Sequence, residues 1–464
     1  MTRDTSARAV DAPPARAGKW AASPAEFRLS NLAALGGRGL VAALTIWLFV
    51  SQSFYDHAAD FKSFYSAGYA VRHPDIPLYD LIALDENPFG ELFKLAPPAA
   101  VYMVPFSYGT VQQARLAWRS VLVITIVAAY AVLAQALGVS ALSWVWLLGL
   151  ALWGQFGPLQ IAVGEGQWDP VFLLLITVAT QAVMRQRLAL VALSVALAGS
   201  IKPYPLALAG YLLARRAWRP LAVLAGVFAL LLMAASLAVG LDEAAAFVTR
   251  VLPASGGTTA YADNQSLGGV LARWVSDDLK PFPLQDARML DFSIRVVALL
   301  ASVVTVWLVA RRPANAPLDR AFQLALFVPL SILVIPAAWT HYQAILLVPL
   351  TLLAVEQLRH RPRQPIGWCV VAALYIVLLL PNPTMLYGAD IDRGLWLRSR
   401  ADSANLALQR LYPTELSRLV LSYKALGVLL LYGALASRVN RPPRPSPVLE
   451  DRAGTSIDPP GEQR

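Results

Sequence analysis

Apolar residues fill long stretches of the chain, and polar residues gather between these stretches. We distinguish twelve apolar segments, near 33–52, 116–137, 139–153, 169–184, 188–200, 204–214, 220–240, 294–310, 321–338, 342–356, 366–380 and 419–436. A helix that crosses a bilayer needs about 20 mostly apolar residues. The pattern predicts an all-α polytopic integral membrane protein. Several segments are shorter than a span, and the pair 188–200 and 204–214 could be two half-helices, so we expect about 12 (10–13) transmembrane helices.

Basic residues occupy alternate connections between the apolar segments. The short connections 185–187, 215–219, 311–320 and 359–363 are rich in arginine, and such connections face the cytoplasm. The four long polar stretches 53–115, 154–168, 241–293 and 381–418 then lie outside. This alternation predicts a multi-pass protein of the bacterial inner (plasma) membrane with both termini in the cytoplasm.

The two ends of the chain differ from the middle. Residues 1–27 and 438–464 are rich in proline, arginine and small or acidic residues, without an apolar period. Such segments cannot bury enough apolar surface to fold. We therefore expect disordered cytoplasmic tails on either side of one transmembrane domain, residues 28–437.

Composition and charge narrow the class further. Of the 464 residues, 57% are hydrophobic and 15% are charged, whereas soluble domains carry about 25% charge. The net charge of +10 comes from basic residues beside apolar segments, where they set topology, so nucleic acid is not an expected partner. The one cysteine, Cys369, excludes a disulfide framework, and no phosphate-binding glycine loop or dinucleotide signature is present.

The predicted outside stretches contain more aromatic and acidic residues than simple connections between helices need. Residues 53–115 are rich in aromatic residues, which suits short helices at the membrane interface or an ordinary aromatic belt. Among them are Phe61, Phe64, Tyr65, Tyr69, Tyr79, Phe89 and Phe93. Asp60 follows the first apolar segment in this stretch. A carboxylate there could accept a proton from a hydroxyl nucleophile. By chemistry alone, Asp56 is an equal candidate.

Motifs along the chain resemble those of glycosyltransferase family 87, whose members are GT-C fold membrane enzymes such as polyprenyl-phosphate-mannose-dependent mannosyltransferases. The likeness runs from about residue 60 to 345. It is carried by Asp60-Phe61 with Phe64-Tyr65, Pro77-Leu78-Tyr79-Asp80, Pro97-Pro98, Gly166-Gln167-Trp168-Asp169, Ile201-Lys202-Pro203-Tyr204-Pro205, Asn264-Gln265-Ser266-Leu267 and Trp339-Thr340-His341. Two positions depart from the pattern: Asp169 stands where asparagine is usual, and Tyr342 where a second histidine is usual.

The resemblance implies a GT-C-like bundle and a role for each matching residue. Asp60 would be the general base for an inverting displacement that moves a hexose from a polyprenyl-phosphate donor to a lipid-linked or glycan acceptor. Contacts to the donor phosphate or sugar would come from Lys202, His341, Gln265 and Asn264. The acceptor or groove side would hold Tyr65, Gln167, Asp169 and Trp339.

Plainer interpretations exist for several of these residues. Lys202 could be an interfacial lysine that reaches the headgroups, and Asp169 could be a helix cap. Asn264 and Gln265 could belong to a polar turn between glycines. The pair Asp390 and Asp392 has metal-binding spacing but lies far from Asp60 in the chain, and we expect no metal site and no cofactor.

A transporter or flippase for a lipid-linked sugar is the rival function. It would also be polytopic, and the broken pair 188–214 fits it. Transporters usually contain internal repeats, and none is evident in this sequence. The one-sided cluster of motif residues favours the glycosyltransferase, with a polyprenyl-phosphate sugar, an acceptor and membrane lipids as its partners.

Overall fold

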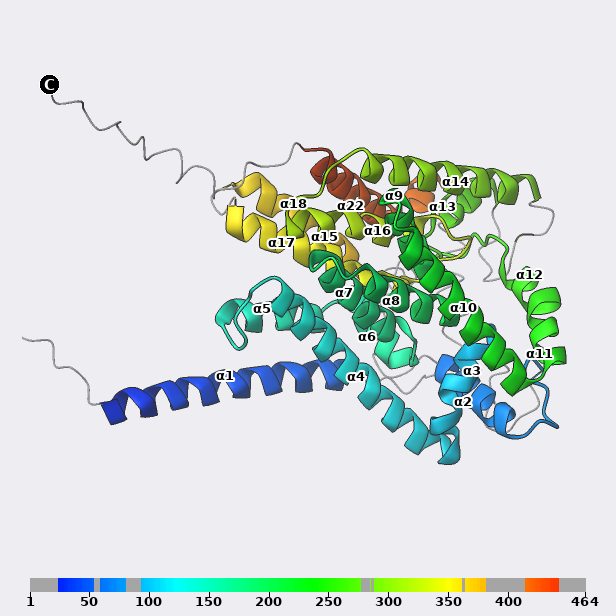
Figure 1. The fold of residues 1–464 in the computed structure, drawn as a ribbon, viewed down its shortest axis with the longest axis horizontal. Coiled ribbons are helices and arrows are strands. Elements are labelled where there is room, and N and C mark those ends of the chain that lie inside the picture. Colours follow the sequence, from blue (N-terminus) through cyan, green and yellow to red (C-terminus); the bar gives the residue numbers. More distant parts are fainter. Residues whose placement is uncertain are drawn as a thin grey trace, which may run out of the picture.

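The computed structural model describes residues 24–53, 59–80, 93–276, 284, 288–360, 364–380 and 414–441. Within these residues the chain is built from helices joined by short turns, without a β-strand (Figure 1). The all-α prediction is confirmed. Asp56 and the Asp390–Asp392 pair lie outside the described residues, as do most of both predicted tails.

The helices follow one another closely along the chain. In order they are α1 (Pro24–Ser53), α2 (Ala59–Arg72), α3 (Pro97–Met103), η2 (Val104–Tyr108), α4 (Val111–Ala136), α5 (Trp144–Gly154), α6 (Gly157–Glu165), α7 (Asp169–Met184), α8 (Leu188–Ile201), η3 (Tyr204–Leu208), α9 (Ala209–Ala214), α10 (Trp218–Val239), α11 (Leu241–Ala246), η4 (Phe247–Val251), α12 (Leu252–Ser255), α13 (Leu267–Val275), α14 (Arg288–Ala310), α15 (Pro317–Ala325), α16 (Phe327–Leu333), η5 (Thr340–Leu346), α17 (Leu347–His360), α18 (Pro365–Leu379), α21 (Glu415–Leu421) and α22 (Tyr423–Asn440).

Membrane-spanning helices are evident, but fewer than twelve are long enough on their own. Among the described residues, five helices are long and apolar enough to cross a membrane, or seven if the bent pairs α5–α6 and α21–α22 each count as one span. Four further apolar segments are shorter: α7, α8, η3 with α9, and α18. The chain is a multi-pass membrane protein, and the count of about twelve spans stays a prediction.

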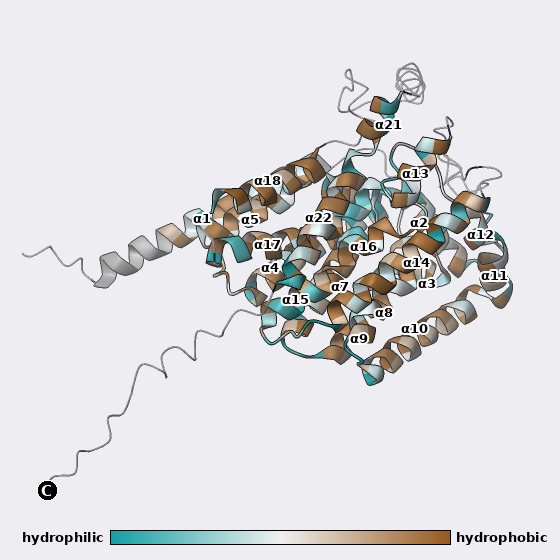
Figure 2. Ribbon diagram, turned by 90° about the horizontal axis from the view of Figure 1, so that it is seen from above, coloured by the Kyte–Doolittle hydropathy of each residue, from teal (hydrophilic) through white to brown (hydrophobic). Residues whose placement is uncertain are grey.

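Helix α7 lies at the centre of the bundle. It packs against α4, α8, α15 and η5, and one of its faces is buried along the whole length from Asp169 to Val183. The outer helices differ, because α10 and α14 keep large apolar side chains exposed, such as Leu237 (67%) and Leu299 (65%). Figure 2 shows hydrophobic residues along these outer helices. Apolar surface of this extent suits contact with lipid.

The bundle has two chemically distinct ends. Helix α7 runs from the motif residue Asp169 to Met184, and α8 returns from Leu188 to the motif residue Lys202. The guanidinium of Arg320 donates to the carbonyls of Val183 and Met184 at the other end. Sixteen helical residues separate the two ends, which is roughly 24 Å at about 1.5 Å per residue. The motif residues and the arginine-rich connections therefore lie at opposite ends.

Several element bounds differ from the expected ones. Helix α1 begins at Pro24, inside the predicted tail 1–27, and α22 ends at Asn440, inside the predicted tail 438–464. The expected outside stretch 154–168 contains helix α6.

Most of the named aromatic residues of the first outside stretch that the structure describes face the protein interior. Phe61, Phe64, Tyr65, Tyr79 and Phe93 are buried in the protein core. Phe61, Phe64 and Tyr65 pack helix α2 onto the bundle, whereas Tyr79 and Phe93 stack on each other beyond its end.

Candidate active site

Four separate parts of the chain meet at the motif end of the bundle. They are the first turn of α2, the turn between α6 and α7, the break after α8, and the beginning of η5. The described cluster consists of Asp60, Glu165, Gln167, Asp169, Lys202, Tyr204, His341 and Tyr342, and we call it the polar cluster.

Helix α2 presents Asp60 in its first turn, where a carboxylate is stabilised by the helix dipole. The next residue, Phe61, is fully buried and fixes the helix in place. Phe61 lies against Gly166, which ends α6 with a left-handed φ of 73°. A Cβ atom at Gly166 would lie 2.7 Å from the Cβ of Phe61, so only glycine allows both the turn and this contact.

Two side chains of helix α4 form hydrogen bonds with the turn between α6 and α7. The indole of Trp118 donates to the carbonyl of Gly166 at 2.7 Å, and Arg119 donates to the carbonyl of Gly164 at 2.7 Å. Both donors are buried. These bonds orient the segment that carries Glu165, Gln167 and Asp169.

A chain of hydrogen bonds joins Asp60 to Lys202. The Nε2 atom of Gln167 donates to Oδ2 of Asp60 at 2.5 Å, and Nζ of Lys202 donates to Oε1 of the same glutamine at 2.8 Å. Gln167 and Lys202 are only 5% and 4% exposed, whereas Asp60 is partly exposed. The carboxylate therefore forms the accessible end of a buried polar chain.

Lys202 also lies beside Asp169 and an aromatic ring. Its Nζ is 4.0 Å from Oδ2 of Asp169 and 4.5 Å from the centroid of the Tyr342 ring. Tyr204 donates to Oδ1 of Asp169 at 2.8 Å and stacks on Tyr342 with ring centroids 4.9 Å apart. Asp169 is fully buried, so the lysine and the tyrosine hydroxyl compensate its charge.

His341 lies between two carboxylates. Its Nδ1 is 3.4 Å from Oε2 of Glu165, and its Nε2 is 3.8 Å from Oδ2 of Asp169. Neither Nε2 of His341 nor Oδ2 of Asp169 has a hydrogen-bond partner among the described residues. Buried polar atoms without partners are rare in folded proteins, and these two fit a site that a ligand completes.

Asn264 and Gln265 lie in the loop before α13, and their side chains form hydrogen bonds with backbone groups of the protein. The amide of Asn264 donates to the carbonyls of Thr259 and Pro336 and accepts from the backbone N–H of Ala338. Gln265 donates to the carbonyl of Leu421 and accepts from the backbone N–H of Ala425. The structure does not join either side chain to the polar cluster. Asn264 instead fixes the segment that leads into His341.

The other predicted groove residues are also held by protein contacts. Tyr65 is buried and donates to the carbonyl of Gly109 at 2.9 Å. Trp339 is half-buried and packs edge-on against Tyr261 with centroids 5.8 Å apart. Burial and the nearby carboxylates of Asp263 and Glu165 raise the pKa of Tyr261 to about 12, so its hydroxyl stays neutral near this segment.

Comparison with known proteins identifies the family. The family model described as "Glycosyltransferase family 87" matches residues 96–336, just over half of the chain. The chain belongs to glycosyltransferase family 87. It is also 27% identical over 352 residues to a polyprenol-phosphate-mannose-dependent alpha-(1-2)-phosphatidylinositol pentamannoside mannosyltransferase of Mycobacterium tuberculosis (strain CDC 1551 / Oshkosh), covering 73% of this chain and 77% of the relative.

Membership of family 87 makes the chain a membrane glycosyltransferase. The predicted resemblance is confirmed, and so is the enzyme class. The matched residues include Gln167, Asp169 and Lys202, whereas Asp60 and His341 lie on either side of them. The structure brings these two outer residues to the same cluster as the matched ones.

Glu165 belongs to the polar cluster, but it was not predicted from the sequence as a site residue. Glu165 contacts His341, and its side chain is 42% exposed, so it reaches the accessible side of the cluster. Its position two residues before Gln167, at the end of an apolar run, is the signal that could have indicated it. The described residues contain no group of three histidine, cysteine or acidic side chains placed to hold a metal ion.

Proposed function

We propose that this family 87 enzyme transfers a hexose, in the first instance mannose, from a polyprenyl-phosphate donor to a lipid-linked or glycan acceptor on the extracytoplasmic side. One observation carries the proposal: a partly exposed carboxylate, Asp60, is linked through Gln167 to the buried cation Lys202. A base and a phosphate-binding charge thereby meet in one cluster. The dependence of the mycobacterial relative on polyprenol-phosphate-mannose supports this donor class.

The reaction that this arrangement favours is a direct displacement. Asp60 accepts the proton of the acceptor hydroxyl, whose oxygen forms the new bond to the anomeric carbon from the face opposite the phosphate. The bond from that carbon to the phosphate oxygen breaks, and polyprenyl phosphate leaves with the electron pair. The configuration inverts, and one carboxylate is enough because the leaving phosphate needs a cation and not a proton.

Lys202 and His341 are the groups that would receive the phosphate. A lysine acts on a phosphate as a point charge, and the unpartnered Nε2 of His341 adds a nitrogen beside it. The break between α8 and η3, which also fits a transporter, places Lys202 in this cluster. The family assignment favours the transferase over that rival.

Replacement of the proposed base tests the function. Asp60→Asn keeps the size of the side chain but removes the proton acceptor, so turnover should fall by about 10²–10⁴-fold. The assay uses purified protein, polyprenyl-phosphate-mannose or polyprenyl-phosphate-glucose, and a glycolipid acceptor. Asp75→Asn, an exposed aspartate of the same stretch, is the matched control and should retain turnover. Near-normal turnover of Asp60→Asn would refute the assignment of the base.

A further inference from the structure

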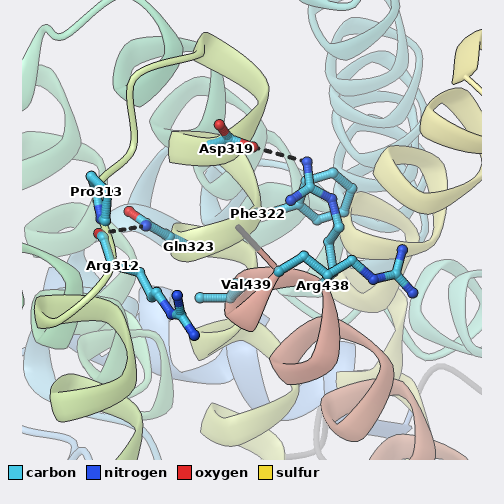
Figure 3. A pocket seen from close by; sticks show the side chains of 8 residues that line it. Arg312, Pro313, Asp319, Phe322, Gln323, Arg438 and Val439 are labelled. Atoms are coloured by element: carbon cyan, nitrogen blue, oxygen red, sulfur yellow. Dashed lines mark hydrogen bonds and ion pairs between the residues drawn. The ribbon is translucent and has the colours of Figure 1, made fainter. Parts of the chain in front are cut away.

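A small pocket lies at the arginine-rich end of the bundle, remote from the polar cluster. It is formed where α14 and α22 end against the first turns of α15. The lining residues are Arg312, Pro313, Asp319, Phe322, Gln323, Arg438, Val439 and Arg441 (Figure 3). Three arginines and one aspartate contribute to this lining. With Glu356, which lies against Arg438 behind the lining, the group carries one net positive charge.

Two of the charged residues in the pocket neutralise each other. Arg438 donates to Asp319 at 2.9 Å and to Glu356 at 2.5 Å, and its guanidinium lies 4.8 Å from the centroid of the Phe322 ring. All three charged side chains are mostly buried. Arg438 is therefore a fixed wall of the pocket, and its charge is balanced within the protein.

Arg312 is different, because its guanidinium makes no hydrogen bond or ion pair to a residue that the structure describes. Its backbone carbonyl accepts from Arg215 and Gln323, which fixes the start of the side chain. Its Nε atom is buried and makes no hydrogen bond to a described residue. In Figure 3 no dashed line joins this guanidinium to another of the pocket residues drawn. Burying an arginine nitrogen without an acceptor costs free energy unless a ligand supplies the acceptor.

The surroundings indicate where such an acceptor comes from. The face of α14 that leads to Arg312 exposes Val303, Val304 and Trp307 by 49–56%. The face of α22 that leads to Arg438 exposes Leu429 and Leu430. Two apolar helix faces thus end at one basic pocket, which matches an anionic lipid with its tails along the helices and its headgroup at their ends.

We propose that this pocket is a binding site for a phosphate group, held by Arg312, with the phosphodiester of an anionic phospholipid as its source. The site is separate from the proposed glycosyl transfer and lies at the opposite end of α7. A guanidinium offers two parallel donors to a phosphate, which fits this chemistry better than an ammonium does.

Binding measured by native mass spectrometry tests the proposal. Purified protein in detergent is titrated with phosphatidylglycerol and, separately, with phosphatidylcholine. We expect the wild type to bind phosphatidylglycerol more tightly, and Arg312→Gln to weaken that binding about tenfold, the effect of one charged hydrogen bond. Arg312→Lys should restore part of the affinity. Because the guanidinium makes no bond within the described protein, these variants should fold normally.

Arg219→Gln is the matched control. Arg219 is an exposed arginine in the first turn of α10, at the same end of the bundle, and removing it deletes the same charge. The preference for phosphatidylglycerol should survive in this variant. Equal losses in Arg219→Gln and Arg312→Gln, or no loss in Arg312→Gln, would overturn the proposal, because the effect would then be general charge attraction.

A second arm separates the two sources of phosphate. Inorganic phosphate is added to the lipid-free protein, and its effect on the melting temperature is compared with that of chloride at equal ionic strength. Stabilisation that depends on Arg312, together with no preference for phosphatidylglycerol, would assign the site to free phosphate. Arg312-dependent binding of the lipid alone would assign it to the phospholipid. Absence of both effects would overturn the site.

Discussion

Lys202 interacts with two carboxylates at once, and this affects its proposed role as a phosphate ligand. Its Nζ is 4.0 Å from Asp169 and is linked through Gln167 to Asp60. A donor phosphate would have to share the lysine with these acids. Asp169 occupies a position where asparagine is usual in the family 87 pattern. This chain therefore carries one more negative charge beside its proposed phosphate site than that pattern would give.

Removal of that charge gives a prediction opposite to the one for Asp60. In Asp169→Asn, Oδ1 can still accept from the Tyr204 hydroxyl, while the charge of Lys202 becomes available to the donor. We expect turnover to be retained and the KM for the polyprenyl-phosphate sugar to fall several-fold. Steady-state kinetics with varied donor measures this. A loss of turnover as large as that of Asp60→Asn would show that the charge of Asp169 is itself required.

Glu165 leads to a second prediction for a single residue. Its carboxylate is 3.4 Å from Nδ1 of His341 and fixes the ring so that Nε2 faces the cluster. In Glu165→Gln the ring loses the neighbouring carboxylate, and we expect kcat to fall about tenfold because His341 is less firmly oriented. Asp242→Asn in α11, an exposed acid, is the control. An unchanged kcat would indicate that Glu165 only faces water.

Among the helical elements, the junction of α6 with α7 depends on one glycine. Gly166 combines a left-handed backbone with a position where an added Cβ atom would lie only 2.7 Å from the Cβ of Phe61. In Gly166→Ala both features are violated, so we expect a loss of about 1–3 kcal/mol in stability and a displaced Asp60. Thermal unfolding and turnover should both decrease.

A glycine in open space provides the comparison. Gly226 lies within α10 and has nothing within 4 Å of the position of a Cβ atom. Gly226→Ala should be neutral or stabilising by up to about 1 kcal/mol, since alanine favours a helix. Equal melting temperatures for the Gly166→Ala and Gly226→Ala proteins would contradict the packing argument.

The same elements show what a linear sequence can and cannot predict. The runs of apolar residues predicted the long helices α4, α10 and α14. The motifs that resemble family 87 predicted Asp60, Gln167, Lys202 and His341 as site residues. The sequence could not indicate that the side-chain amides of Asn264 and Gln265 form hydrogen bonds with backbone groups, because those partners are up to 160 residues away. Nor could it show that Glu165 contacts His341, since that pairing depends on how α6 meets η5.

Helix length explains the remaining disagreement at this scale. A count based on apolar segments treats 169–184, 188–200 and 204–214 as spans, whereas the helices there are too short to cross a bilayer unaided. Their ends carry polar cluster residues, which interrupt the apolar runs. The chemistry of the site and the ambiguity of the span count therefore have the same cause.

For the whole molecule, the two-ended arrangement makes a prediction about sidedness. Cys369 is the one cysteine, so Cys369→Ser provides a background without thiols. Ser255→Cys at the end of α12 should react with an impermeant maleimide in intact cells, and Arg187→Cys between α7 and α8 only after lysis. Labelling of both cysteines from the same side would refute the opposed ends.

The brevity of α7 and α8 has a consequence for the bilayer itself. These helices contain 16 and 14 residues, or roughly 24 and 21 Å at about 1.5 Å per residue. The hydrocarbon core is about 30 Å thick, several ångströms more than either helix. If the arginine ends lie at one membrane surface, Asp169 and Lys202 would lie several ångströms beneath the opposite surface. Under the proposed function, the prenyl-linked sugar and its acceptor would then meet where the bilayer is locally thinned around the protein.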